Sequence, residues 1–247
     1  MKAMIFAAGL GTRLRPLTDT MPKALVPVCG QPLLYHVIGK LRDAGYDHLV
    51  VNVHHFAGQI RKYLSENDFG VKISISDESD ELLETGGGIR HARSLLLPSD
   101  GPFLVHNVDI ISDADLAWFR EQTPPDALAT LLVSKRKSKR YLLFDDNMRL
   151  VGWENVETGE YKSAYWNFFR PEDCHRYAFA GIHNLSPAVF DAFDALNAPS
   201  RFPIMDFYLR ACAEYPIYGV KAPQLTIVDV GKFDTLPQAE ALCRELL

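Results

Sequence analysis

A glycine-containing loop near the start of this 247-residue chain has the residue types and spacing needed to bind phosphate. It follows the apolar run 4–8 and contains Gly9, Gly11, Arg13 and, further on, Lys23. Glycines lack a Cβ atom, so the backbone can turn tightly or approach a ligand, and the N–H groups of such a turn can surround phosphate oxygens. The arginine and the lysine add positive charge that glycine cannot supply. The segment therefore indicates a phosphate-binding loop that is positioned by a buried strand.

Neither of two common phosphate-binding motifs accounts for this loop. The dinucleotide fingerprint requires a third glycine that opens a helix, but Leu14 occupies that position, and Arg15 and Pro16 follow it. The ATPase-type loop requires Gly-Lys-Ser/Thr after four spacer residues, and the segment contains no such run. By themselves, two glycines after a strand are also compatible with an ordinary turn.

Two aspartates far apart in the chain, Asp109 and Asp229, each come just after an apolar run. Mg²⁺ bound near a polyphosphate takes one or two protein carboxylates and completes its octahedron with phosphate oxygens and water. An aspartate at the end of a strand can equally serve in a turn or as a helix cap. If the two carboxylates lie together, their repulsion should raise the pKa of at least one of them when no metal is bound.

The elements that must position these residues alternate between strand and helix in the first half of the chain. Strands are expected at 2–7, 48–53, 71–76 and 102–106, and helices at 32–44, 59–64, 86–97 and 113–122. Asp113 is expected to cap the last of these helices. Such alternation predicts an α/β fold with a parallel sheet and right-handed crossovers, whose ligands bind beyond the carboxyl ends of the strands. Four candidate residues follow expected strands: Gly9, Asn107, Asp109 and Asp229.

The second half of the chain has a different pattern, which predicts a small β extension of the sheet. Strands are expected at 127–133, 141–144, 150–153, 177–183 and 225–228, and helices at 187–196, 203–215 and 236–246. The basic run 135–140 is typical of a solvated loop. The aromatic-rich stretch 154–176 either covers a substrate or packs over the sheet. Without a linker or an internal repeat, residues 1–247 are expected to form one domain, with no appended acyltransferase domain.

Composition narrows the functional class. The net charge of −5 argues against a nucleic-acid partner, and no apolar run is long enough to cross a membrane. The N-terminus lacks the features of a secretion signal. The four cysteines are far apart, as expected for free thiols in a reducing compartment. We therefore expect a cytoplasmic protein with small-molecule partners.

Several of these segments together resemble the sugar-phosphate nucleotidyltransferase family. The resemblance covers 7–18 with 22–27, 84–88, 107–109 and 228–231. It implies a Rossmann-like, mostly parallel sheet sandwiched by helices, of the nucleotide-diphospho-sugar transferase type. It also implies a reaction in which an NTP and a sugar 1-phosphate give an NDP-sugar and pyrophosphate.

The family resemblance assigns a role to each candidate residue. Arg13 and Lys23 would be catalytic, and Asp109 and Asp229 would hold Mg²⁺. The nucleotide would bind in the half 1–125, to Ala8, Gly9, Gly11, Thr12, Glu84, Gly86, Gly87 and Asn107. The sugar phosphate would bind in the half 126–247, to Gly181 and His183.

Three positions depart from the family pattern. Val108 replaces the glycine of an Asn-Gly-Asp motif. His183 stands where an aromatic residue is common. The segment 153–155 lacks the lysine of a Glu-Lys-Pro motif that touches the sugar phosphate, so another cation, such as Lys162 or Lys232, would replace it.

The resemblance leaves the substrates open. It is strongest to N-acetylmuramate 1-phosphate uridylyltransferases, which predicts UTP as the donor. Mannose 1-phosphate guanylyltransferase-like enzymes and phosphocholine cytidylyltransferases are alternatives. Some proteins of this fold are non-catalytic, nucleotide-sensing regulatory subunits, but these typically lose the arginine, the lysine or a metal carboxylate, and this chain keeps them. A monomer and a homodimer are both compatible with the sequence.

Overall fold

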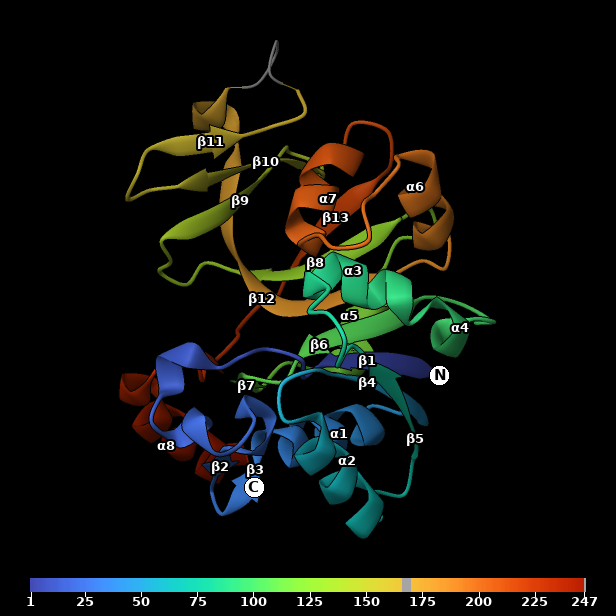
Figure 1. Ribbon diagram of the computed structural model, residues 1–247. Helices are drawn as coiled ribbons and strands as arrows, with labels where there is room; N and C mark the ends of the chain where they lie inside the picture. Colours follow the sequence, from blue (N-terminus) through green and yellow to red (C-terminus); the bar gives the residue numbers. More distant parts are fainter. Residues whose placement is uncertain (166–169, 247) are drawn as a thin grey trace.

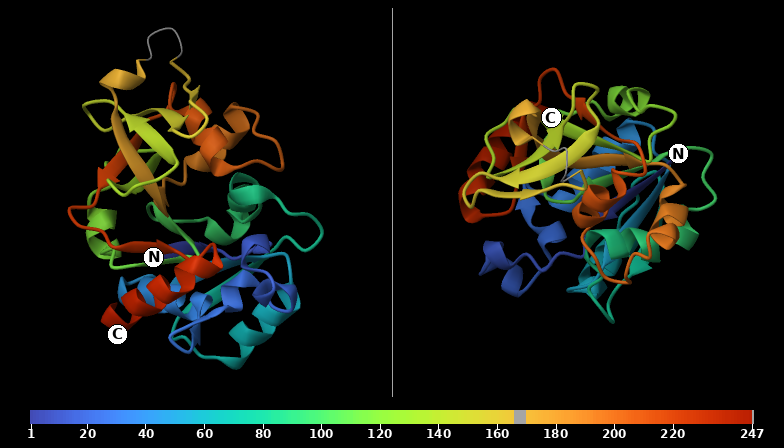
Figure 2. Two further views of the ribbon diagram at one scale, coloured as in Figure 1. Left: turned by 90° about the vertical axis from the view of Figure 1, so that its left-hand side faces the viewer. Right: turned by 90° about the horizontal axis from the view of Figure 1, so that it is seen from above.

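The computed structural model describes residues 1–165 and 170–246, in which a ten-stranded mixed sheet carries helices on both faces (Figures 1 and 2). The main sheet has the strand order β11-β10-β9-β12-β6-β1-β4-β5, and β8 pairs with β12 and β13. Its strands are β1 (Lys2–Phe6), β4 (His48–Val53), β5 (Lys72–Asp77), β6 (Phe103–Asn107), β8 (Ala129–Ser134), β9 (Arg140–Phe144), β10 (Leu150–Asn155), β11 (Glu160–Lys162), β12 (His175–Leu185) and β13 (Ile217–Lys221).

The remaining elements are short strand pairs and helices. The strands β2 (Pro27–Val28) and β3 (Gln31–Pro32) form one pair, and β7 (Ile110–Ser112) and β14 (Ile227–Asp229) form another. The helices are α1 (Leu33–Asp43), α2 (Ala57–Glu66), α3 (Glu84–His91), α4 (Arg93–Leu96), α5 (Leu116–Glu121), α6 (Val189–Ala195), α7 (Ile204–Ala211) and α8 (Leu236–Leu246).

The order of the parallel strands places a ligand crevice between β1 and β6. β1 pairs in parallel with β4 on one side and with β6 on the other, and β4 pairs in parallel with β5. The chain thus runs outward from β1 to β5 and then returns to the opposite side of β1. Strand order reverses at this point, and α/β sheets bind ligands beyond the carboxyl ends of the strands at such a reversal. Here those ends are Phe6 and Asn107.

The sheet is buried on both faces, which explains the continuous apolar runs of its first strands. Ala3 and Ile5 of β1 pack in one core cluster with residues of α1 and α8, whereas Met4 packs in a second cluster with residues of α3, α6 and α7. Figure 1 shows α1, α2 and α8 on one side of β1 and β4, and α3, α6 and α7 on the other. Strands β9, β10 and β11 form the expected extension at the far end of the sheet (Figure 1).

The predicted α/β fold class is confirmed, and several elements differ in detail. The strand β13 was missed in the sequence. The predicted helix 86–97 begins earlier and is divided into α3 and α4, and the predicted helix 203–215 is shortened to α7. α5 is capped by Asp115, whose Oδ1 accepts the Trp118 N–H, and not by Asp113, which accepts the N–H of Thr226. The aromatic residues Trp166, Phe168 and Phe169 lie outside the described residues.

The C-terminal segment closes against the first half of the chain. The predicted last strand is present as β14, which pairs with β7 and not with the main sheet. α8 then lies beside β2 and β3 (Figure 1), where the Cys29 N–H donates a hydrogen bond to Glu240 Oε1 at 2.8 Å. All four cysteines are free thiols. Across residues 1–165 and 170–246, no helix has the length and apolar character to span a membrane.

Candidate active site

A cavity of about 390 Å³ opens at the carboxyl ends of β1 and β6. Nine of the residues singled out in the sequence line it: Ala8, Gly9, Gly11, Thr12, Arg13, Lys23, Glu84, Asn107 and Asp109. A larger cavity of about 520 Å³ lies between α1, β7 and α5, but neither the glycine loop nor Asp109 reaches it. The cavity at β1 and β6, called the crevice below, is therefore the candidate active site.

The glycine loop positions Lys23 through close packing at Gly11. Gly11 has φ +63°, and a Cβ atom there would lie 3.0 Å from Thr18 Cγ2 and 3.1 Å from Lys23 Cβ. The Thr18 hydroxyl donates to the Gly11 carbonyl oxygen at 2.8 Å, and the Leu14 N–H donates to the same oxygen at 2.9 Å. The left-handed backbone and the close approach both require glycine. Around Gly9, by contrast, the space is open.

Charges of both signs meet at the crevice. Lys23, which is 9% exposed, forms an ion pair with Asp109. Arg13 lies beside Asp229, because a Cβ atom at Gly231 would be 3.2 Å from Arg13 Nη2 and 2.8 Å from Asp229 Oδ1. The third cation of the loop, Arg15, is instead paired with Asp19 at 3.2 Å and is not part of the crevice lining.

The pairing of β7 with β14 brings the two candidate metal ligands together. Asp229 is opposite Ile110, and the Val230 N–H donates to the Asp109 carbonyl oxygen at 2.8 Å. The Asp229 side chain faces solvent, yet the protein atoms packed around it partly desolvate the carboxylate. This desolvation, followed by the charge of Asp109, raises the pKa of Asp229. The direction agrees with the prediction, but desolvation contributes more to the raised pKa than the predicted repulsion by Asp109.

The donor set at these carboxylates suits a hard divalent cation. Asp109 and Asp229 supply oxygen ligands of the kind that Mg²⁺ prefers, and Lys23 supplies the positive charge next to Asp109 in this structure. Within the described residues, no three or more His, Cys, Asp or Glu side chains form a metal-binding cluster. Two carboxylates leave coordination positions for phosphate oxygens, so the site fits a cation that arrives with a polyphosphate.

The crevice also contains a buried polar pair that sequence reasoning missed. Asn52, at the end of β4, accepts the Ala7 N–H on Oδ1 at 2.7 Å and donates from Nδ2 to Glu78 Oε1 at 2.8 Å. Glu78 is 3% exposed, and burial raises its pKa. An asparagine near the carboxyl end of a valine-rich strand was the available signal, because candidate residues also lie at or just after the carboxyl ends of β1 and β6.

Gly86 and Gly87 do not approach the crevice as predicted. Their N–H groups both donate to the Phe202 carbonyl oxygen, at 2.8 and 3.1 Å. A Cβ atom at Gly86 would overlap the Phe202 ring, and one at Gly87 would overlap the Ser200 carbonyl oxygen. These glycines therefore allow the loop before α7 to pack on α3, and the crevice is lined instead by Glu84 and Thr85.

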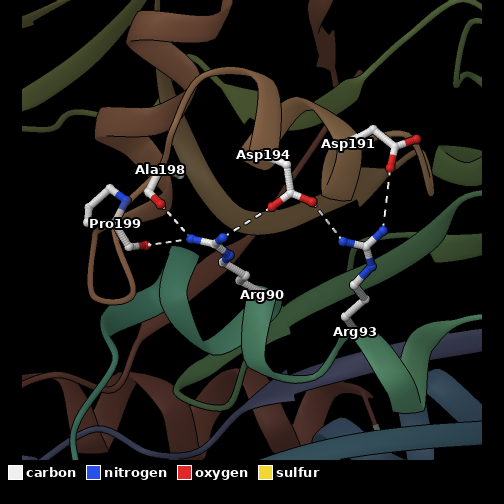
Figure 3. Close-up of polar contacts among 6 residues, drawn as sticks. All are labelled: Arg90, Arg93, Asp191, Asp194, Ala198 and Pro199. Atoms are coloured by element: carbon white, nitrogen blue, oxygen red, sulfur yellow. Dashed lines mark hydrogen bonds and ion pairs between the residues drawn. The ribbon is translucent and has the colours of Figure 1, made fainter.

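Polar contacts hold α3 and α4 against α6 and the loop that follows it (Figure 3). Asp194 accepts hydrogen bonds from Arg90 at 3.1 Å and from Arg93 at 2.9 Å. Arg90 also donates to the carbonyl oxygen of Ala198 at 2.5 Å, and Arg93 donates to Asp191 at 3.4 Å. Single exposed ion pairs stabilise little, but a network with shared partners restrains geometry. This network fixes the helix whose first residues line the crevice.

Of the two predicted sugar-side residues, one adjoins the crevice and one is buried in the core. Gly181 has φ +75°, and a Cβ atom there would lie 2.9 Å from Asn107 Nδ2, so glycine is required beside this crevice residue. His183 is 1% exposed, its Nδ1 lies 2.5 Å from the Tyr208 hydroxyl, and its ring packs against Phe179. The prediction that His183 faces the sugar is therefore corrected, because its ring fills the space between β12 and α7.

The buried His183 should make the protein sensitive to acid. Burial lowers the pKa of His183 from 6.5 to about 3. Between these values the unfolded chain binds a proton and the folded protein does not, so stability is fully present above pH 6.5 and falls as the pH drops below it. The expected loss from this residue is about 2 kcal/mol of unfolding free energy between pH 8 and pH 5.

Urea unfolding at several pH values measures this effect. His183→Gln should reduce the loss of stability between pH 8 and pH 5 by about that amount. His91→Gln, which changes an exposed histidine, is the matched control and should keep the wild-type slope. An unchanged slope in His183→Gln would show that the folded protein protonates His183 normally.

Comparisons with known proteins agree with this geometry. A family model described as nucleotidyl transferase matches residues 2–141. N-acetylmuramate alpha-1-phosphate uridylyltransferase from Caulobacter vibrioides is 34% identical, over 98% of this chain and 97% of that protein. The enzyme of the same name from Neisseria meningitidis is 32% identical, over 98% of each chain. A crystal structure of a putative glucose-1-phosphate thymidylyltransferase from Bacillus anthracis superposes with a TM-score of 0.79 at 22% identity, covering 99% of this chain and 96% of that one.

Proposed function

Because this chain belongs to the nucleotidyl transferase family, we propose that it makes an NDP-sugar and pyrophosphate from an NTP and a sugar 1-phosphate. The observation that carries the proposal is the convergence of the glycine loop, Arg13, Lys23 and Asp109 on one crevice. A non-catalytic regulatory subunit would have no need to keep two cations and two carboxylates in this arrangement.

The reaction needs no covalent intermediate and no general base. An ionised oxygen of the acceptor phosphate attacks the α-phosphorus of the NTP in line. The new O–P bond forms as the bond between the α-phosphorus and the bridging oxygen to the β-phosphate breaks, and pyrophosphate leaves with that electron pair. Catalysis then depends on positioning and on neutralising the charge of the phosphate oxygens.

The two cations of the loop would neutralise that charge at different points along the triphosphate. Arg13 is exposed beside Gly231 and can reach the departing pyrophosphate. Lys23 is buried next to Asp109 and can reach the α-phosphate. Asp109 and Asp229 would hold Mg²⁺, which when bound supplies further positive charge to the phosphate oxygens. Lys23 would then share Asp109 with the cation or turn toward the phosphate.

The substrates divide between the two halves of the chain. In residues 1–125, the loop 8–12, Glu84, Thr85 and Asn107 would hold the nucleotide, and the Asn52–Glu78 pair would hold the crevice floor in place. In residues 126–247, Gly181, which packs closely against Asn107, would form part of the sugar side of the crevice. The reaction would take place in the cytoplasm, where its NTP substrate is available.

We expect UTP as the preferred donor and N-acetylmuramate 1-phosphate as the preferred acceptor. The support is that both relatives named above, which match the chain over nearly its whole length, are N-acetylmuramate 1-phosphate uridylyltransferases. Pyrophosphate release should be measured for ATP, CTP, GTP, UTP and dTTP against a panel of sugar 1-phosphates. The expected kcat/KM for UTP is at least about tenfold higher than that for any other donor. A site that forms hydrogen bonds with one base discriminates against another, because its polar groups are left without partners when the other base binds.

Other outcomes of this screen are equally decisive. A preference for GTP with mannose 1-phosphate would make the protein a guanylyltransferase, and a preference for CTP with phosphocholine would make it a cytidylyltransferase. Binding of NTP without pyrophosphate release from any pair would indicate a regulatory subunit and would contradict the proposed reaction.

A further inference from the structure

The acceptor phosphate needs a cation on the side of the crevice formed by residues 126–247. A sugar 1-phosphate is an anion that must approach the triphosphate as well as Asp109 and Asp229. Arg13 and Lys23 belong to the opposite side, on the loop that would hold the NTP. The segment 153–155, Trp-Glu-Asn, contributes no positive charge.

Arg136 is a half-buried cation of this half whose donors are left largely unused. It follows β8, and its Nη2 donates to the Phe179 carbonyl oxygen of β12 at 2.9 Å. Its Nε is buried without a hydrogen-bond partner, and among the described residues no carboxylate lies within ion-pair distance of it. A guanidinium has five N–H donors. The contact with Phe179 uses one of them and holds the side chain in place, so other donors remain for a ligand. Its neighbours Lys135 and Lys137 are exposed.

The contact with Phe179 places Arg136 beside the crevice. The pairing of β12 with β8 shifts register between Phe179 and His183. Gly181 lies inside this irregular stretch and adjoins Asn107, which lines the crevice. The guanidinium is therefore anchored two residues from Gly181, which packs against the crevice residue Asn107.

We propose that Arg136 binds the phosphate of the sugar 1-phosphate, an inference that rests on the reaction proposed above. A guanidinium can donate two parallel hydrogen bonds to one phosphate, which fixes the orientation of the attacking oxygen as well as neutralising its charge. Anchoring by the Phe179 carbonyl oxygen pre-orients the side chain for this contact.

Other cations of the same half are less suited to this role. Lys162 lies 3.8 Å from Glu160 and 4.0 Å from Asp206, and its ammonium stacks over Trp153. Arg176 is paired with the buried Glu154 at 2.6 Å. Lys232 is exposed directly after Gly231 and is the main competitor, but its position on the Arg13 side favours the pyrophosphate.

Steady-state kinetics of Arg136 variants test the proposal. Arg136→Ala should raise the KM for the sugar 1-phosphate at least about tenfold, the effect of losing a charge-assisted hydrogen bond, and should leave the KM for the NTP within about twofold. Arg136→Lys should bind the sugar 1-phosphate more tightly than Arg136→Ala does, because lysine restores the positive charge but cannot donate two parallel hydrogen bonds to one phosphate. Lys135→Ala and Lys137→Ala, on the same loop, should behave as wild type.

Calorimetry separates this proposal from the proposed reaction. Wild type should bind the sugar 1-phosphate more tightly than the same sugar without phosphate, and Arg136→Ala should lose that difference. If wild type binds the sugar 1-phosphate in this way but releases no pyrophosphate, the proposed reaction fails and the role of Arg136 stands. Equal affinity of Arg136→Ala and wild type, or an equal rise of both KM values, overturns the role of Arg136. If Lys232→Ala weakens binding of the sugar 1-phosphate and Arg136→Ala does not, then Lys232 binds the phosphate instead of Arg136. Should Arg136→Ala unfold, the same comparison is made with Arg136→Lys and Arg136→Gln.

Discussion

Lys23→Ala and Arg13→Ala should each reduce turnover at least about a hundredfold while the protein remains folded. Removing a single preorganised donor that stabilises developing charge typically costs that much in kcat. Both side chains line the crevice, and Lys23 is buried against Asp109, so its charge is weakly screened by solvent. Pyrophosphate release under saturating substrate measures the effect, and circular dichroism checks the fold.

The loop itself provides a matched control. Arg15→Ala removes a cation two residues from Arg13, but one that is paired with Asp19 and is absent from the crevice lining, so turnover should stay within about twofold of wild type. Near-normal pyrophosphate release by both Lys23→Ala and Arg13→Ala would show that these cations belong to the surface and not to the reaction. The proposed mechanism would then be wrong.

Asp109→Asn should abolish Mg²⁺-dependent turnover, with a loss of at least about a thousandfold. The substitution keeps the shape of the side chain and removes its charge, and metal-based stabilisation of a transferring phosphoryl group is worth several kcal/mol at 1.36 kcal/mol per tenfold. The fold should be retained, because the backbone carbonyl oxygen of Asp109 still accepts the N–H of Val230, just after β14, and an asparagine oxygen can still accept a hydrogen bond from Lys23. Titration with Mn²⁺, followed by electron paramagnetic resonance in the presence of NTP, should show weakened metal binding.

Asp113→Asn serves as the control for this experiment. Asp113 lies four residues further along the chain and accepts the Thr226 N–H, a contact that asparagine preserves, so turnover and Mn²⁺ affinity should match wild type. If Asp109→Asn binds Mn²⁺ as tightly as wild type, then Asp109 does not hold the metal. The carboxylate would in that case serve only as the counter-ion of Lys23.

The fold class and the phosphate side of the site could be predicted from the sequence because both depend on short-range patterns. Alternating strands and helices require crossovers, and crossovers require a parallel sheet whose strand ends meet at one edge. Residues that follow a strand, such as Gly9, Asn107 and Asp109, are therefore brought together by the topology itself. Asp229 reaches Asp109 in another way, through the antiparallel pairing of β14 with β7 in a separate two-stranded sheet, which was not predicted from the sequence.

The residues that were predicted wrongly have partners far away in the sequence. Gly86 and Gly87 have the composition of a ligand-facing helix start, yet the Phe202 carbonyl oxygen, over a hundred residues further on, occupies their N–H groups. His183 lies two residues from Gly181 on β12, the spacing expected for two residues on the same face of a strand. Tyr208 of α7 nevertheless covers its ring. Which neighbour meets a given face of a strand or helix depends on the packing of distant segments, and periodicity carries no information about it.

The sequence by itself determined which residues could do the chemistry, and the tertiary structure decided which of them share a site. Charge, glycine spacing and strand ends identified Arg13, Lys23 and the two aspartates, because these are local properties. The structure added the Asn52–Glu78 pair, and it showed that Arg136, from a basic run that was expected to be a solvated loop, donates to the Phe179 carbonyl oxygen of β12. Such residues gain their role from a carbonyl oxygen or a side chain on another strand, and only the folded chain brings those partners within hydrogen-bond distance.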